Sequence, residues 1–203
     1  MAINYTIQAE IVDITADTPK AEDVFLVDTN VWYWMTYPNA SSYVPSQLTD
    51  YPSYLNHALG SNSKIHHSGL SLAELAHLIE KTEREIYERA VCAIKPKEYR
   101  HNIPGEHSRV ASEIQAAWGQ VTSLADPLTV TIDATITSAA LSRLQTEKVD
   151  GYDLFILESM KSHGVVQVIT DDGDFATVPG IQVFTANRNV IQAAKAQGKL
   201  LAR

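Results

Sequence analysis

The stretch VFLVDTNVW, residues 24–32, begins with four consecutive apolar residues and turns polar at Asp28. A short apolar run of this kind is typical of a parallel strand that is buried on both faces. Asp28, Thr29 and Asn30 leave the strand, and a helix can begin within residues 31–34. The stretch therefore predicts a buried strand that ends in an acid and is followed by a helix.

Further strands and helices are expected to alternate along the chain. Strands are predicted at residues 64–68, 128–132, 165–169 and 181–184. Helices are expected at residues 71–92, 110–124 and 150–163, after Asp133, and from Asn187 to about Ala196. Alternation of this type implies a single α/β domain over residues 1–203, with three layers and a central parallel sheet of about five strands.

Two of these helices have further signals at their ends and along one face. Gly164 occupies the usual C-terminal glycine position after the helix at 150–163. Asp133 is expected to cap a helix in which Ile136, Ala140 and Leu144 have the spacing of a buried face.

Three segments do not fit the alternation. Residues 1–23 form an arm in which apolar residues alternate from Ile3 to Ile11, as in a strand with one buried side. Residues 36–64 are rich in Pro, Ser, Asn and Tyr, and we expect an irregular insertion with a short helix near 54–59. Residues 92–127 are a second insertion, where Pro96 ends the preceding helix and residues 97–109 are expected to be loop.

Composition excludes several classes of protein. The 203 residues are 45% hydrophobic and 20% charged, which is ordinary for a globular protein, and there is no apolar run that could span a membrane. The amino-terminal residues lack the pattern of a signal peptide, and the single cysteine, Cys92, excludes an internal disulfide. Cytoplasmic residence is the default expectation.

Net charge is −8, which argues against a module that binds nucleic acid through bulk positive charge. Basic residues nevertheless gather in residues 81–109, with seven Lys or Arg, and in residues 175–203, with four and no acid. These two stretches could hold a phosphate backbone, or they could be solvated surface.

Acids occur where the predicted strands end. Asp28 follows one strand, residues 171–174 (Asp-Asp-Gly-Asp) follow another, and Glu74 and Asp153 lie in the first turns of two helices. In open α/β sheets these positions share one edge, so the acids can converge. Clustered carboxylates repel one another and need a cation, and Mg²⁺ prefers such oxygen ligands.

Each acid also has a purely local interpretation. Ser71 and Glu74 have the spacing of a capping box, and Asp153 can be a first-turn acid that the helix dipole favours. Asp28 could cap the next helix, and residues 171–174 could form a turn. Taken singly each local interpretation is favoured, whereas four acids at one sheet edge favour a site.

Four segments in order resemble the motifs of the PIN-domain family. They are Val27–Trp32, Ser71–Leu75, Tyr152–Ile156 and Val168–Phe175. Each motif is weakly specific alone, but the ordered set is fairly specific. The resemblance implies a PIN-like α/β fold and a metal-dependent nuclease that acts on RNA with Mg²⁺ or Mn²⁺.

The resemblance also implies roles for individual residues and partners. Asp28, Glu74, Asp153 and Asp172 would be the catalytic metal-binding acids, with Asp174 as an auxiliary metal ligand and Thr29 or Asn30 orienting a water. Many bacterial members are VapC-type toxins, commonly dimeric and held inactive by a small antitoxin protein. An RNA substrate, an antitoxin and a homodimer are therefore the expected partners.

Two other functions remain open from the sequence. The chain could be a catalytically inactive PIN-like scaffold that binds RNA or protein, although such a scaffold would not need four acids. It could also be a metal-dependent phosphatase, although Asn30 occupies the place of the second acid in the haloacid-dehalogenase pattern. The aromatic residues at 32, 33, 34 and 37 could stack bases, or they could belong to the core.

Overall fold

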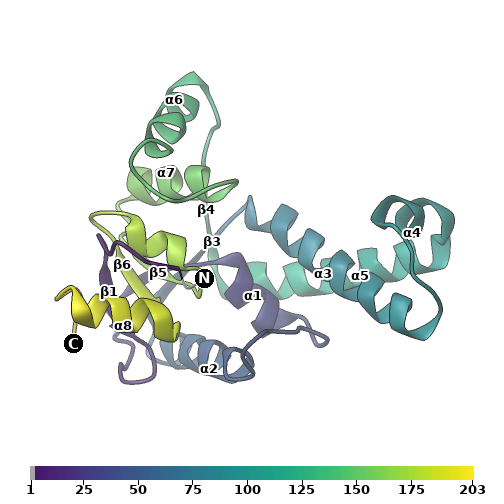
Figure 1. Ribbon diagram of the computed structural model, residues 1–203, viewed down its shortest axis with the longest axis horizontal. Coiled ribbons are helices and arrows are strands. Elements are labelled where there is room, and N and C mark those ends of the chain that lie inside the picture. The colour runs from purple at the N-terminus through teal and green to yellow at the C-terminus, as the bar shows by residue number, and fades with distance from the viewer. Residues whose placement is uncertain (1–2) are drawn as a thin grey trace.

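Six parallel strands form one sheet in the computed structural model, which describes residues 3–203 (Figure 1). The strand order is β1-β6-β5-β2-β3-β4. The strands are β1 (Glu10–Asp13), β2 (Val24–Val27), β3 (Lys64–Ser68), β4 (Asp126–Leu128), β5 (Gln167–Ile169) and β6 (Gln182–Thr185). Because every pairing is parallel, all the carboxyl ends lie at one edge of the sheet.

Residues 3–203 contain eight α-helices and one 3₁₀ helix between and after the strands. They are α1 (Thr29–Thr36), α2 (Gln47–Gly60), α3 (Ser71–Ala90), α4 (Pro96–Asn102), α5 (Pro104–Leu124), α6 (Ala134–Arg143), α7 (Asp153–His163), η1 (Gly173–Thr177) and α8 (Arg188–Ala196). Among residues 3–203, none of these helices is long and apolar enough to cross a membrane.

Two hydrophobic cores lie on opposite faces of the sheet. Phe25 and Val27 pack with residues of α1, α2, α3 and α5 on one face. Leu26, between them in β2, packs with residues of α6, α7 and α8 on the other face. Successive side chains of a strand point to opposite faces, so the continuous apolar run of β2 serves both cores. The predicted three-layer α/β/α architecture is confirmed.

The predicted number of strands, about five, is one too low because the amino-terminal arm joins the sheet. β1 pairs with β6, with Glu10 opposite Gln182. The alternation was expected from Ile3, but pairing begins only at Glu10, and Ile3 is 73% exposed. Residues 8 and 9 instead donate their backbone N–H groups to the Ala176 carbonyl.

The strand predicted at 128–132 is wrong in position. β4 ends at Leu128, opposite Ser68, which is itself the last residue of β3. Residues beyond Leu128 therefore have no neighbouring strand to pair with, and Ile132 is 51% exposed.

Both insertions are more helical than expected. In α2 the buried residues are Tyr51, Tyr54, Leu55 and Ala58, a helical spacing that the polar and proline-rich surroundings concealed. Pro96 and Pro104 begin α4 and α5 rather than marking loop, because proline lacks only an N–H that the first helical turn leaves unpaired.

The predicted helix ends are mostly confirmed. Asp133 Oδ1 accepts from the Ile136 N–H at 2.9 Å, Asn187 caps α8, and Gly164 has a left-handed φ of 67° after α7. The predicted burial of Leu144 is wrong: α6 ends at Arg143, and Leu144 is 50% exposed.

Helices α3, α4 and α5 extend away from the sheet as one arm (Figure 1). A fully buried carboxylate, Glu83 of α3, ties this arm to the end of α1. It accepts hydrogen bonds from the Tyr37 hydroxyl and the Asn39 amide and pairs with Arg109 of α5. Because a buried charge is stable only when it is paired and hydrogen-bonded, these contacts fix the base of the arm.

Candidate active site

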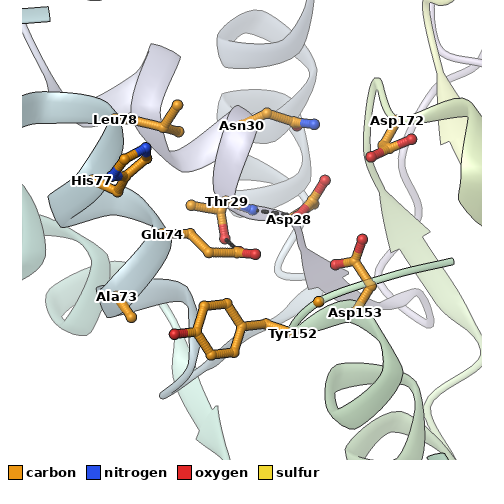
Figure 2. Close-up of a pocket in the computed structure, with 11 residues that line it drawn as sticks. Asp28, Thr29, Asn30, Ala73, Glu74, His77, Leu78, Tyr152, Asp153 and Asp172 are labelled. Atoms are coloured by element: carbon orange, nitrogen blue, oxygen red, sulfur yellow. Dashed lines mark hydrogen bonds between the residues drawn. The ribbon is translucent and has the colours of Figure 1, made fainter. Parts of the chain in front are cut away.

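Four acids from four different elements line one cavity of about 530 Å³ (Figure 2). Asp28 follows β2, Glu74 lies in the first turn of α3, Asp153 begins α7, and Asp172 follows β5. Thr29, Asn30, His77, Leu78 and Tyr152 complete much of the lining. The cavity lies at the carboxyl edge of the sheet, where open α/β folds bind ligands.

Two threonines hold two of the acids in place. Asp28 is 7% exposed; its Oδ1 accepts from the Thr29 N–H and its Oδ2 from the Thr170 hydroxyl, each at 2.6 Å. The Thr29 hydroxyl donates to Glu74 Oε2 at 2.5 Å (Figure 2). Thr29 therefore positions one acid through its backbone and another through its side chain.

The electrostatics of the cavity disfavour the ionised acids. Burial raises the pKa of Asp28 to about 7, and the negative charges of Asp172 and Glu74 add to this. Burial likewise raises the pKa of Asp153 to about 9, with contributions from Asp28 and Glu74. Among the described residues that line the cavity there is no Lys or Arg. Positive charge from outside the protein would therefore stabilise the ionised acids.

The donor chemistry of the cavity fits a hard divalent cation. Carboxylate oxygens converge there, and the buried Asn30 Oδ1 has no hydrogen-bond partner among the described residues. Within residues 3–203, no three His, Cys, Asp or Glu side chains form a compact metal-binding group as they stand. Mg²⁺ usually binds through one or two carboxylates and keeps several waters, so it does not require such a group.

The local interpretations of the acids have different outcomes. The N-cap residue of α3 is Leu70, and no side-chain hydrogen bond caps this end of the helix. Ser71 and Glu74 therefore do not form a capping box. Asp28 does cap α1, and Asp172 caps η1 by accepting from the Asp174 N–H at 2.9 Å. Asp28 and Asp172 therefore each cap a helix and also line the cavity.

The other two acids of the fourth motif lie outside the cavity. Asp171 accepts from the Tyr51 hydroxyl at 2.6 Å and from Gln47, and it lines a neighbouring cavity. Asp174 lines a third cavity beside Tyr5 and Lys148. The role of Asp174 as an auxiliary metal ligand stays a prediction.

The amino-terminal arm contacts the fourth motif directly. The Tyr5 ring lies against Gly173, so close that a Cβ at this position would overlap the ring. Burial and the charges of Asp174, Asp172 and Asp171 raise the pKa of Tyr5. The glycine between the acids therefore allows the arm to pack over this loop.

Thr170 is a positioning residue that the sequence did not single out. It is fully buried, donates to Asp28 and accepts from the Asp172 N–H at 2.9 Å. One hydroxyl thus joins two cavity acids. The available signal was a polar residue at the end of an apolar strand, directly before the acidic segment.

Replacing Thr170 by Val should test this link. Valine keeps the shape but leaves Asp28 Oδ2 and the Asp172 N–H without their partner, which should cost about 1–3 kcal/mol of stability. Mutation of groups that orient metal ligands typically lowers metal affinity or activity about 10–100-fold, and we expect a loss of this size. Urea unfolding and metal titration would measure the two effects. Thr170→Ser should restore both, and failure of this rescue would contradict the assigned role.

The fold and the site together define the class of protein. It is a parallel α/β protein with a cavity, at the carboxyl edge of its sheet, whose acids favour a bound cation. The family model of the PIN domain matches residues 25–181. The chain belongs to the PIN domain family. PIN domains are generally nucleases, which are hydrolases, and they typically use divalent metals.

Similarity to individual proteins is low. Among solved structures, the chain is similar to the VapBC2 complex from Rickettsia felis bound to a DNA fragment from their promoter. The identity is 15%, the match covers 80% of this chain and 98% of that chain, and the TM-score is 0.46. No curated protein matches the chain.

Proposed function

We propose that this protein is a divalent-metal-dependent endoribonuclease that hydrolyses RNA phosphodiester bonds at the acidic cavity. The observation that supports this most is the convergence of four acids from separate elements on one cavity that no Lys or Arg of the described residues lines. Burial and mutual repulsion raise the pKa of Asp28 and Asp153, so the cavity requires added positive charge.

Asp28, Glu74, Asp153 and Asp172 would hold Mg²⁺ or Mn²⁺. A bound divalent ion lowers the pKa of water and stabilises charge on phosphoryl oxygens. Hydrogen bonds from Thr29 and Thr170 hold both carboxylate oxygens of Asp28 in fixed positions. The buried Asn30 Oδ1, which has no hydrogen-bond partner within residues 3–203, is an acceptor that can orient a water molecule at the cavity wall.

Hydrolysis needs no covalent link to the protein. The water oxygen bonds to phosphorus, one P–O bond of the RNA backbone breaks, and a water proton ends on the leaving oxygen. The role of the acids is to position the reacting groups and to balance the charge, which are the main contributions to phosphoryl-transfer catalysis.

Because its motifs resemble those of VapC-type members, we further propose that this nuclease is the toxin of a toxin–antitoxin pair and that it acts in the cytoplasm. A small antitoxin protein and a second copy of this chain would then be its partners. Induced expression should slow bacterial growth, whereas Asp28→Asn should not. Normal growth with the wild-type protein at the same level would contradict the toxin role without contradicting the nuclease.

The nuclease itself is tested by incubating a mixed RNA pool with the purified protein and Mg²⁺, Mn²⁺ or EDTA, beside Asp28→Asn. We expect cleavage only with a divalent ion and only by the wild-type protein. RNA that survives every metal condition would contradict the proposal and favour the scaffold, and release of phosphate from a small ester with RNA intact would favour the phosphatase.

A further inference from the structure

A second cavity, of about 390 Å³, adjoins the acidic one. Asn30, Leu78 and Asp172 line both cavities, so the two lie next to each other. The walls of the second cavity come from α1, the loop after α1, the start of α2, the middle of α3 and the loop after β5. Three acids, Glu85, Asp171 and Asp172, are part of this lining. A chain that passes through the acidic cavity can therefore continue into the second one.

The second cavity has more aromatic residues in its lining than the first, Tyr33, Trp34 and Tyr43 against Tyr152. Trp34 and Tyr43 line it, and Trp34 is held on one side by Tyr51, with ring centroids 5.2 Å apart and a tilt of 34°. The Trp34 Nε1–H donates to the Ser41 carbonyl at 3.3 Å, which connects the ring to the loop that carries Tyr43. Trp34 is thus a preorganised ring at the wall of the cavity.

Tyr43 lies at the rim of the cavity and is 100% exposed. It makes no side-chain hydrogen bond within the described residues, and no aromatic partner packs against it there. Its ring therefore contributes nothing evident to the core, and both of its faces are open to a ligand. Aromatic rings in this position are the platforms on which single-stranded nucleic acids stack their bases.

Lys81 of α3 supplies positive charge at the same place. Arg84, Arg100 and Arg109, elsewhere on the arm, pair with glutamates. Lys81 is exposed, lines the second cavity and takes part in none of the ion pairs among residues 3–203. It lies seven residues after Glu74, two helical turns along the same helix, so it faces the same groove one step beyond the acids.

We propose that the second cavity is a nucleobase subsite for single-stranded RNA, in which a base next to the cleaved phosphate stacks between Tyr43 and Trp34 while Lys81 contacts its phosphate. This deepens the nuclease proposal above and rests on it for the identity of the substrate. A base must leave its own stack to enter the cavity, so the subsite selects single strands over duplexes. Base stacking also explains how a protein with a net negative charge binds RNA, because stacking contributes affinity that bulk positive charge would otherwise supply.

The test is equilibrium binding of a labelled single-stranded RNA to the full chain carrying Asp28→Asn, with the same comparison repeated in cleavage assays of the otherwise wild-type chain. Removing a stacking ring costs about 1–3 kcal/mol, that is, about 5- to 150-fold in Kd. Tyr43→Ala should therefore weaken binding by about 10-fold or more, and Tyr43→Phe should retain wild-type affinity. Since the Tyr43 ring is fully exposed, neither change threatens the fold.

Lysine variants provide a matched pair. Lys81→Ala should weaken binding and lower the slope of log Kd against log salt by about 0.7, the value for one phosphate contact on a single strand. Lys64→Ala is the control, because Lys64 begins β3 at the opposite edge of the sheet and should change nothing. An RNA of the same sequence in duplex form should bind weakly and be insensitive to Tyr43→Ala.

The outcomes separate the two proposals. If the wild-type chain cleaves RNA but Tyr43→Ala binds and cleaves like the wild type, the subsite is wrong and the nuclease stands. If RNA binds in a Tyr43-dependent way but no metal supports cleavage, the subsite stands and the nuclease is wrong. If RNA neither binds nor is cleaved, both are overturned.

Discussion

Replacing Asp153 by Asn is expected to abolish cleavage and, in the absence of metal, to make the protein more stable. Loss of a group that only orients a metal ligand already costs about 10–100-fold, so loss of a ligand itself should lower the cleavage rate by more than about 100-fold. The same carboxylate is partly buried beside Asp28 and Glu74, and no side-chain hydrogen bond among the described residues stabilises its charge. Removing it should therefore stabilise the metal-free fold by about 1–2 kcal/mol, as is usual when a strained functional site is relieved.

The effect of Asp153 on stability should depend on pH, and the direction follows from its raised pKa. The pKa of Asp153 is raised from 3.8 to about 9, so the folded protein binds this proton more tightly than the unfolded chain does. The associated stability is fully present below pH 3.8 and is lost as the pH rises through about 9. Stability of the wild-type protein in EDTA should therefore fall across this window, and that of Asp153→Asn should fall less.

Urea unfolding in EDTA at pH 5 and pH 8 would measure the difference. Asp126→Asn is a suitable control, because Asp126 is an exposed residue of β4 that does not line the acidic cavity. The opposite result, an Asp153→Asn variant that is less stable at pH 8, would mean that this carboxylate is stabilised by contacts and is not strained. Added Mg²⁺ or Mn²⁺ should stabilise the wild-type protein and not the variant.

Replacing Arg203 by Met is expected to destabilise the fold by about 3–5 kcal/mol, the usual cost of leaving a buried ionic partner unpaired. Arg203 pairs with Asp17 and Asp23 at 2.6 Å each, and all three side chains are at least nine-tenths buried. Its guanidinium also lies 4.6 Å from the centroid of the Phe184 ring. Methionine would fill much of the space but would leave two carboxylates without their cation.

The cost should shrink in acid. Burial raises the pKa of Asp23, but the hydrogen bonds from Arg203, the Lys20 N–H and Gln167, together with the charge of Arg203, outweigh burial and lower the net pKa from 3.8. A lowered pKa gives stability that is present above pH 3.8 and lost as the pH falls through the folded pKa. In the variant the buried carboxyl should instead protonate readily, so the difference between the two proteins should be largest near pH 7 and smaller near pH 4.

Denaturant midpoints at these two pH values would measure the change. Arg188→Met is the matched control: Arg188 is exposed at the start of α8, makes no ion pair among the described residues, and should leave stability unchanged. Equal losses at pH 7 and pH 4 would show that Arg203 acts through packing rather than through charge. The structure also shows that Arg203 is engaged internally, although the basic residues of 175–203 suggested a phosphate-binding stretch.

The sequence by itself determined the layered fold and the set of acids at the sheet edge. β2, β5 and β6 are short strands whose apolar residues are buried on both faces, so their local composition indicates their burial in the fold. Asp28 and Asp172 end two such strands, and the parallel arrangement of the strands brings their carboxyl ends to one edge. The convergence of these acids followed from the alternation of strands and helices alone.

Only the tertiary structure decided what depends on partners distant in sequence. β1 forms where β6 offers an open edge, and β4 stops where β3 ends, neither of which is encoded in the strand's own residues. Thr170 matters because Asp28, 142 residues earlier, accepts a hydrogen bond from its hydroxyl. Glu74 could equally have capped α3 until the fold placed Thr29 beside it. Hydrogen-bond choices of this kind depend on distances between separate elements, which local pattern does not contain.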